Sequence, residues 1–268
     1  MPALNDRDIA TGIGRDHDRV VKDVSVDQFG KSLIVIPTYN EADNLEPLVR
    51  EIMALPTVFD ILVVDDNSPD GTGEIADRLA SELPQVHVLH RSGKMGLGTA
   101  YVQGFGWALQ RDYEYILQMD CDFSHHPRYL PTFLELIEHA DLGVGSRYVL
   151  EGGTANWGFL RKFISAGGNF FARTMLGLKT HDCTGGFRCY RRKMIELVPW
   201  EEIHLHGYGF QIGVVYHIER LGARIVEFPI IFEDRRIGKS KMSIAIVVEA
   251  FAFVIRMVFT GGRIGRVI

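Results

Sequence analysis

From Ser32 onward, short apolar runs alternate with stretches in which apolar residues recur at helical spacing. The apolar runs predict strands at residues 32–37, 60–65, 86–90, 115–119 and 142–146. The helical spacing predicts helices at residues 42–54, 71–83, 98–110 and 127–139. Because strands that alternate with helices usually build a mainly parallel sheet with helices on its faces, we predict an α/β fold.

Beyond about residue 150 the alternation weakens. Residues 151–157 are rich in Gly and small polar side chains, and a further helix is expected at residues 160–176. We expect this half of the chain to complete the site of the first half rather than to form its own domain. The chain then divides into a polar N-terminal tail (1–30), one main domain (31–241) and a C-terminal amphipathic segment (242–268).

The strongly apolar residues 242–260 include Glu249 and Arg256, which argues against a helix that crosses a bilayer. Together with Arg263 these charges recur every seven residues, so on a helix they form a narrow polar stripe opposite a wide apolar face. The pattern suits a helix on a membrane surface, and equally one that packs on the core of the main domain or on a partner. In the membrane case we expect the lipid-facing side chains to be Phe251, Phe253, Ile255 and Phe259.

Composition narrows the class of protein. A chain of 268 residues that is 46% apolar can bury one substantial core. Its formal net charge of -5 argues against a nucleic-acid partner, because binding to phosphate backbones depends on clustered positive charge. The three cysteines form neither a disulfide framework nor a zinc-site spacing, and the first residues lack the apolar stretch of a secretory signal. We therefore expect a cytoplasmic protein.

Polar side chains gather directly after the first, second and fourth predicted strands. The first strand ends in residues 37–41, and the second ends in a stretch with three carboxylates, Asp65, Asp66 and Asp70. A solvated turn explains Asp70 but not the adjacent pair. Because ligands of parallel α/β sheets bind outside the carboxyl ends of the strands, we expect these side chains to face a ligand.

Asp120 and Asp122 stand on either side of Cys121, just past the fourth predicted strand. Two carboxylates with this spacing can hold a hard divalent cation between themselves and the diphosphate of a nucleotide. For an isolated pair an exposed turn is the more frequent explanation. The other strand-end motifs are needed to decide between the two.

Taken together, these motifs resemble the polyprenol-phosphate mannose synthases of glycosyltransferase family 2, from about Leu33 to Met242. The matching segments are 37–41, 64–66, 68–72, 96–98, 120–122, 145–148, 184–188 and 190–192, together with Arg235, Gly238, Ser240 and Lys241. The resemblance implies a nucleotide-sugar-binding fold of the GT-A type, with a mainly parallel twisted sheet. It also implies Mg²⁺ or Mn²⁺ as cofactor.

The reaction implied by the resemblance is an inverting transfer of mannose from GDP-mannose to a polyprenyl (dolichyl-type) phosphate, which releases GDP. The lipid acceptor implies association with the cytoplasmic face of a membrane, at its surface or through a membrane partner subunit. One alternative keeps the lipid acceptor but takes glucose or an aminosugar from a UDP-sugar. Another is a silent nucleotide-sugar-binding or scaffold protein, against which the complete set of charged residues counts.

The resemblance also assigns residues to roles. The donor is expected to contact Pro37, Tyr39, Glu41, Val64, Asp66, Met119, Asp120, Cys121, Asp122, Arg147, Arg235 and Lys241. Of these, Asp122, Arg235 and Lys241 would be catalytic, and the metal would bind Asp120, Asp122 and Ser124. Some family members carry Gln where this chain has Ser124, so we expect the shorter hydroxyl to act through water.

Overall fold

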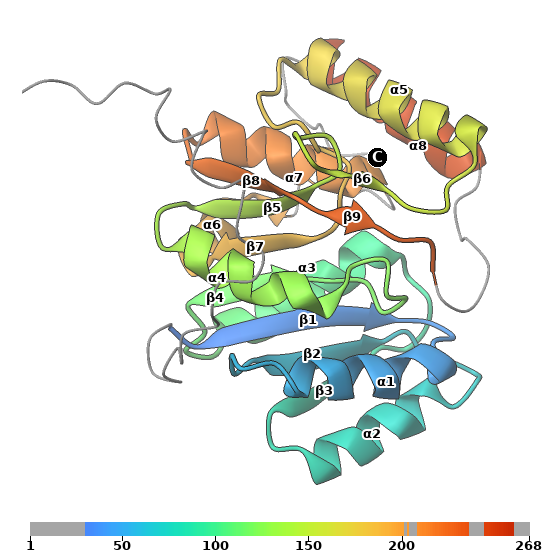
Figure 1. Cartoon of the computed structure of the whole chain (residues 1–268), viewed down its shortest axis with the longest axis vertical. Helices are drawn as coiled ribbons and strands as arrows, with labels where there is room; N and C mark the ends of the chain where they lie inside the picture. Colours follow the sequence, from blue (N-terminus) through green and yellow to red (C-terminus); the bar gives the residue numbers. More distant parts are fainter. Residues whose placement is uncertain (1–29, 201–202, 204–207, 236–243, 260–268) are drawn as a thin grey trace, which may run out of the picture.

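A seven-stranded sheet runs through the centre of the molecule, with helices on both faces (Figure 1). The computed structural model describes residues 30–200, 203, 208–235 and 244–259. The sheet order is β3-β2-β1-β4-β7-β5-β8, and β7 is antiparallel to both of its neighbours while all other pairs are parallel. The strands are β1 (Ser32–Thr38), β2 (Asp60–Asp65), β3 (Val86–His90), β4 (Tyr115–Gln118), β5 (Leu142–Ser146), β7 (Arg188–Arg191) and β8 (Ile225–Pro229).

Two apolar layers hold the helices against the sheet. On one face the core includes side chains of α1 (Ala42–Met53), α2 (Thr72–Glu82) and α4 (Leu130–Ile137). On the other face it includes side chains of α3 (Leu97–Leu109), α6 (Arg192–Leu197) and α7 (Tyr208–Arg220). The central strands are apolar on both sides for this reason, as expected of a sheet covered on both faces.

A third apolar cluster lies beside the sheet, where α5 (Phe159–Leu176) and α8 (Ile244–Phe259) run side by side and pack on α7 (Figure 1). A small parallel sheet of β6 (Gly153–Thr154) and β9 (Ile231–Phe232) lies nearby. No helix in the described ranges has the length and apolar character needed to cross a membrane.

The structure corrects our expectation for α8. Phe253 is only 5% exposed and packs in the third cluster with Val254 and Met257, so the prediction that it faces lipid is wrong. The helix is apolar on two sides, and one of them contacts α5 and α7. Phe251, Ile255 and Phe259 are exposed on α8, and their contact with lipid stays a prediction.

The predicted strands are confirmed to within one residue at each end, and so is the parallel sheet they form. The helix expected at 127–139 is instead a 3₁₀ turn, η1 (Pro127–Tyr129), followed by α4. Pro131 stands in the first turn of α4, where the missing N–H needs no partner, so a new helix begins there. The proposed tail and the C-terminal boundary involve residues 1–29, 236–243 and 260–268, which lie outside the described residues.

Candidate active site

Most of the residues predicted to form the site lie in the loops after β1, β2 and β4, where the chain reverses its direction across the sheet. From β1 the chain proceeds outward through β2 to β3, and then returns to place β4 on the other side of β1. A crevice at the carboxyl ends of the strands is expected at such a reversal, and it is the usual ligand site of open α/β sheets. The loops after β1, β2 and β4 all begin at this edge, because the three strands are parallel.

The loops after β1 and β2 are joined into one rigid unit. Pro37 lies opposite Val64 in the parallel register, and the Asp66 N–H donates to the Thr38 carbonyl at 3.0 Å. The Asp65 carboxylate, 1% exposed, accepts hydrogen bonds from the Thr38 hydroxyl at 3.0 Å and the Ser68 hydroxyl at 2.6 Å. Asp65 therefore holds the two loops together, and Asp66 is the neighbouring carboxylate at the edge where a ligand is expected.

The other predicted nucleoside contacts surround this unit. The half-buried Tyr39 ring lies under the Lys94 ammonium, which is 4.4 Å from its centroid. The Glu41 carboxylate accepts a hydrogen bond from the Asn44 side chain at 2.8 Å. Val64 is fully buried in the core under α3. Their contacts with a nucleoside stay a prediction.

Arg91 is a site residue that the sequence analysis missed. Its guanidinium, buried between β3 and α3, forms an ion pair with Asp66 and donates to the Thr99 hydroxyl at 2.6 Å. Burial raises the pKa of Asp66, and the positive charge of Arg91 opposes that rise. A lone Arg after an edge strand is usually exposed, so only its burial beside Asp66 marks it.

The Asp120–Asp122 loop directly follows β4. The Tyr101 hydroxyl donates to the Asp120 carboxylate at 3.0 Å, and the Ser124 N–H donates to the Asp122 carboxylate at 3.1 Å. Phe123, between Asp122 and Ser124, adopts a φ of 63°. This left-handed conformation is rare for bulky residues and often marks functional loops. Met119 and Cys121 are almost fully buried beneath this loop, in the core with α1 and α4.

The two carboxyl groups share one electrostatic environment. Burial raises the pKa of Asp120, and the negative charge of Asp122 adds to the rise, while the hydrogen bond from Tyr101 and the positive charge of Arg235 oppose it. A pair of close carboxylates in partly buried surroundings favours a bound cation, because the cation relieves their repulsion.

Arg235 comes to this loop from the far end of the chain. Its guanidinium lies 2.9 Å from the Asp122 carboxylate, and its side chain is 17% exposed. Arg235 belongs to the segment that follows β9, and that segment reaches the carboxyl end of β4. The structure thus brings two of the three predicted catalytic residues together, whereas Lys241 lies outside the described residues.

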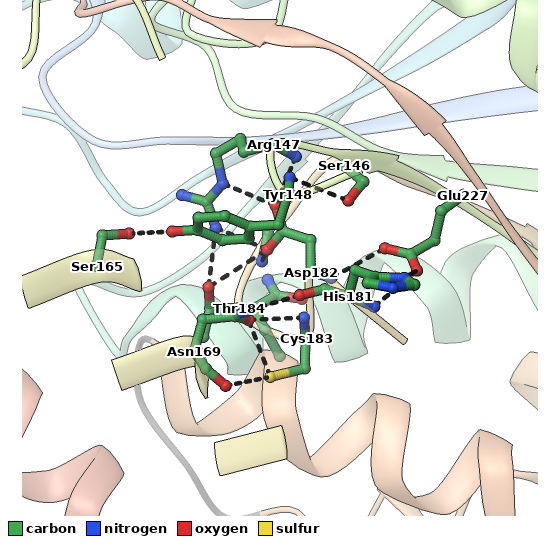
Figure 2. A network of polar contacts seen from close by, with 12 residues as sticks. Ser146, Arg147, Tyr148, Ser165, Asn169, His181, Asp182, Cys183, Thr184 and Glu227 are labelled. Atoms are coloured by element: carbon green, nitrogen blue, oxygen red, sulfur yellow. Dashed lines mark hydrogen bonds and ion pairs between the residues drawn. The ribbon is translucent and has the colours of Figure 1, made fainter. Parts of the chain in front are cut away.

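Arg147, predicted to bind phosphate, is held by a buried carboxylate (Figure 2). Its guanidinium donates two parallel hydrogen bonds to Asp182, each 2.7 Å long, and a third to the Thr184 hydroxyl at 2.8 Å. Burial by itself would raise the pKa of Asp182, but the Arg147 guanidinium holds it below its usual value. A contact between Arg147 and phosphate stays a prediction.

Asp182 also organises the loop that enters β7. Its carboxylate accepts the backbone N–H of Gly185 at 2.8 Å, and its own N–H donates to Glu227 of β8 at 2.9 Å (Figure 2). Next to it, the Cys183 thiol contacts the Asn169 side chain, and burial raises the pKa of Cys183 to about 12. Cys183 is therefore a protonated structural thiol under ordinary conditions.

The chain belongs to glycosyl transferase family 2, whose family model matches residues 33–198. It is 48% identical to an undecaprenyl-phosphate mannosyltransferase of Micrococcus luteus over 84% of this chain and 92% of that protein. It is 45% identical to a polyprenol monophosphomannose synthase of Mycolicibacterium smegmatis, over 82% of this chain and 84% of the relative. Both matches confirm the family that the strand-end motifs indicated.

Solved structures with low sequence identity share the fold. Mannosyl-3-phosphoglycerate synthase from Rubrobacter xylanophilus matches with a TM-score of 0.64 at 19% identity, over 89% of this chain and 77% of that one. A mannosyltransferase from Pyrobaculum calidifontis, in complex with GDP-Man and Mn²⁺, matches with a TM-score of 0.55 at 15% identity, over 87% of this chain and 66% of that one. These likenesses confirm the predicted GT-A type of fold.

Proposed function

We propose that this chain transfers mannose from GDP-mannose to a polyprenyl phosphate, with inversion at the anomeric carbon. Mannosyl transfer to polyprenyl phosphate is the activity that both relatives' names state, at 48% and 45% identity over most of the chain. At the site, the contact between Asp122 and Arg235 at the end of β4 carries the proposal. Carboxylates such as Asp122 commonly bind divalent cations, and guanidinium groups such as that of Arg235 commonly bind phosphate.

A divalent cation fits the side chains at this loop. Asp120 and Asp122 offer hard carboxylate oxygens, which Mg²⁺ and Mn²⁺ prefer. In the described part of the chain no group of three or more His, Cys, Asp and Glu side chains is placed to hold a metal alone. A cation held by one or two carboxylates plus substrate phosphates is a common arrangement at nucleotide sites. When bound, such a cation would stabilise the negative charge of the diphosphate.

The residues of this chain suit a transfer without a general base. A phosphate monoester has its second pKa near about 6, so the acceptor is already largely anionic at neutral pH. One of its oxygens forms a bond to the anomeric carbon as the bond to GDP breaks, and GDP leaves with the electron pair. Arg235, next to Asp122, is placed to stabilise the charge on the departing GDP.

The reaction is tested by incubating the full chain with labelled GDP-mannose, UDP-glucose or a UDP-aminosugar, each with a short polyprenyl phosphate. We expect organic-soluble label only from GDP-mannose in the presence of Mg²⁺ or Mn²⁺, and almost none in excess chelator. Label from a UDP-sugar alone would overturn the donor, and equal turnover in chelator would overturn the metal. No transfer from any donor would refute the activity.

An exposed apolar surface on α5 supports peripheral membrane association as part of this proposal. Phe159, Leu160, Phe163 and Phe170 are between 67% and 85% exposed. The helix carries Arg161, Lys162 and Arg173 but no acidic residue, although the whole chain has a net charge of -5. Apolar side chains flanked by basic ones bind anionic membrane surfaces. The neighbouring helix α8 also carries exposed apolar side chains, among them Val248, Ile255 and Phe259. The two helices run side by side (Figure 1).

We expect the triple variant Phe159→Ser, Phe163→Ser and Phe170→Ser to lose binding to vesicles that contain phosphatidylglycerol, by about tenfold or more. The three rings are exposed, so the variant should melt like the wild type. Val58→Ser, which changes a 51% exposed residue ahead of β2, is the matched control and should bind normally. Co-sedimentation measures the binding, and unchanged binding of the triple variant would contradict this role of α5.

A further inference from the structure

His125 lies in the loop that follows β4, in contact with both parts of the candidate active site. The residue is 1% exposed, and its Nδ1 accepts a hydrogen bond from the Asp120 N–H at 3.1 Å. We propose that His125 is a positioning residue that fixes Asp120 and Asp122 for the metal and the diphosphate. The inference rests on the proposed function, because it assigns the residue to that same site.

The Asp120 N–H depends on His125 because the strand pairing ends just before it. The Met119 N–H still reaches the Val35 carbonyl of β1, at 3.3 Å. On the other side of β4 the partner strand is β7, whose first residue lies opposite Gln118. The Asp120 N–H therefore lies beyond the ladder, and a backbone donor at a partly buried position needs another acceptor.

Two aromatic rings hold the His125 ring in place. It stacks on Phe187 with a centroid distance of 4.7 Å and an interplanar angle of 8°. It also meets Phe232 edge-on, at 5.3 Å and 81°. Phe187 immediately precedes β7, and Phe232 ends β9, so the His125 orientation is set by segments from outside its own loop.

The contact with Phe232 links the two charged parts of the site. Arg235 lies three residues after Phe232 and reaches Asp122 at 2.9 Å. His125 thus bonds to the backbone that carries Asp120 and packs against the strand that delivers Arg235. Neither contact requires His125 to touch a substrate, which is why we assign it a positioning role. Groups that orient metal ligands in this way commonly change metal affinity or activity by about tenfold to a hundredfold when they are replaced.

Two substitutions distinguish the role of the His125 hydrogen-bond acceptor from the role of its aromatic ring. His125→Phe keeps an aromatic ring for Phe187 but removes the acceptor. His125→Asn loses the ring but places its side-chain oxygen close to the position of Nδ1. We expect His125→Phe to weaken Mn²⁺ binding in the presence of GDP by about tenfold or more, and His125→Asn to restore most of that affinity. His126→Phe is the control, because His126 accepts the N–H of Arg128 at 3.2 Å and lies 3.4 Å from Glu51, while the Asp120 N–H is bonded to His125.

Free Mn²⁺ is measured by electron paramagnetic resonance in titrations of each protein with GDP present, alongside a thermal melt. Equal Mn²⁺ affinity in the wild type and in a folded His125→Phe protein would overturn the positioning role. So would equally weak binding in the Phe and Asn variants. If His125→Phe does not fold, His125→Leu replaces it under the same criteria. Failure of the wild type to bind Mn²⁺ with GDP would instead refute the proposed metal site, so the two failures are distinguishable.

Discussion

Asp122→Asn should reduce mannosyl transfer by about a hundredfold or more and leave the fold intact. The Asp122 carboxylate contacts Arg235 at 2.9 Å and accepts the Ser124 N–H at 3.1 Å. The Asn oxygen can still accept that N–H, so the loop keeps its hydrogen bond while the negative charge disappears. A loss of rate is then attributable to the charge rather than to collapse of the loop.

The measurement is the rate of label transfer from GDP-mannose at saturating Mn²⁺, together with a thermal melt. Asp112→Asn serves as the matched control, because Asp112 forms an ion pair with Lys31 at 3.0 Å but is 81% exposed and lies before β4. An exposed pair of this kind contributes little, so the control should retain its rate and melt like the wild type. A folded Asp122→Asn protein with wild-type turnover would show that this carboxylate takes no part in the reaction.

Arg235→Ala should also lower transfer by about a hundredfold, with the larger effect on kcat rather than on KM. A cation that stabilises the leaving GDP acts most strongly when negative charge develops, which is in the transition state. Arg235→Lys should recover part of the rate, because it keeps the charge but loses the planar fork that binds phosphate oxygens in pairs. The sequence predicts a similar loss for Lys241→Ala, with Lys239→Ala nearly harmless.

Steady-state kinetics of the Arg235 variants with GDP-mannose as the varied substrate measure this effect. Arg128→Ala is the control, because Arg128 is 52% exposed and lies 4.0 Å from Glu233, in the segment that leads to Arg235. If Arg235→Ala raised KM alone, Arg235 would bind the donor equally in the ground and transition states. If both Arg variants kept wild-type kinetics, the segment after β9 would have no catalytic role.

The loops after β1, β2 and β4 were predictable because their position follows from local order along the chain. Each predicted strand ends where its apolar run ends, and parallel strands bring their carboxyl ends to one edge. Asp66 and Asp122 could therefore be placed at the same edge of the sheet from sequence. The division of labour between Asp65 and Asp66 could not, since it depends on whether Ser68 or Arg91 reaches each carboxylate.

The unpredicted parts of the fold have a different cause. β7 is a short strand, Arg188–Arg191, inserted antiparallel between β4 and β5. Its charged and polar residues give no apolar run, because its place in the sheet comes from its neighbours on both sides. The sequence analysis did not single out Asp182 for a related reason. Its role is to form a buried ion pair with Arg147, which lies in another segment of the chain.

By itself the sequence determined the first five strands and the helices between them, the strand-end carboxylates and the family to which the chain belongs. These features depend on patterns within short stretches of sequence, and such patterns can be recognised without knowledge of the tertiary structure. The tertiary structure alone decided that Arg235 meets Asp122, that His125 closes the Asp120 loop and that Phe253 faces the core. The Arg235 and Phe253 contacts join distant segments, and the His125 ring is held by Phe187 and Phe232 from outside its own loop. All three therefore depend on the packing of helices and strands rather than on the spacing of residues.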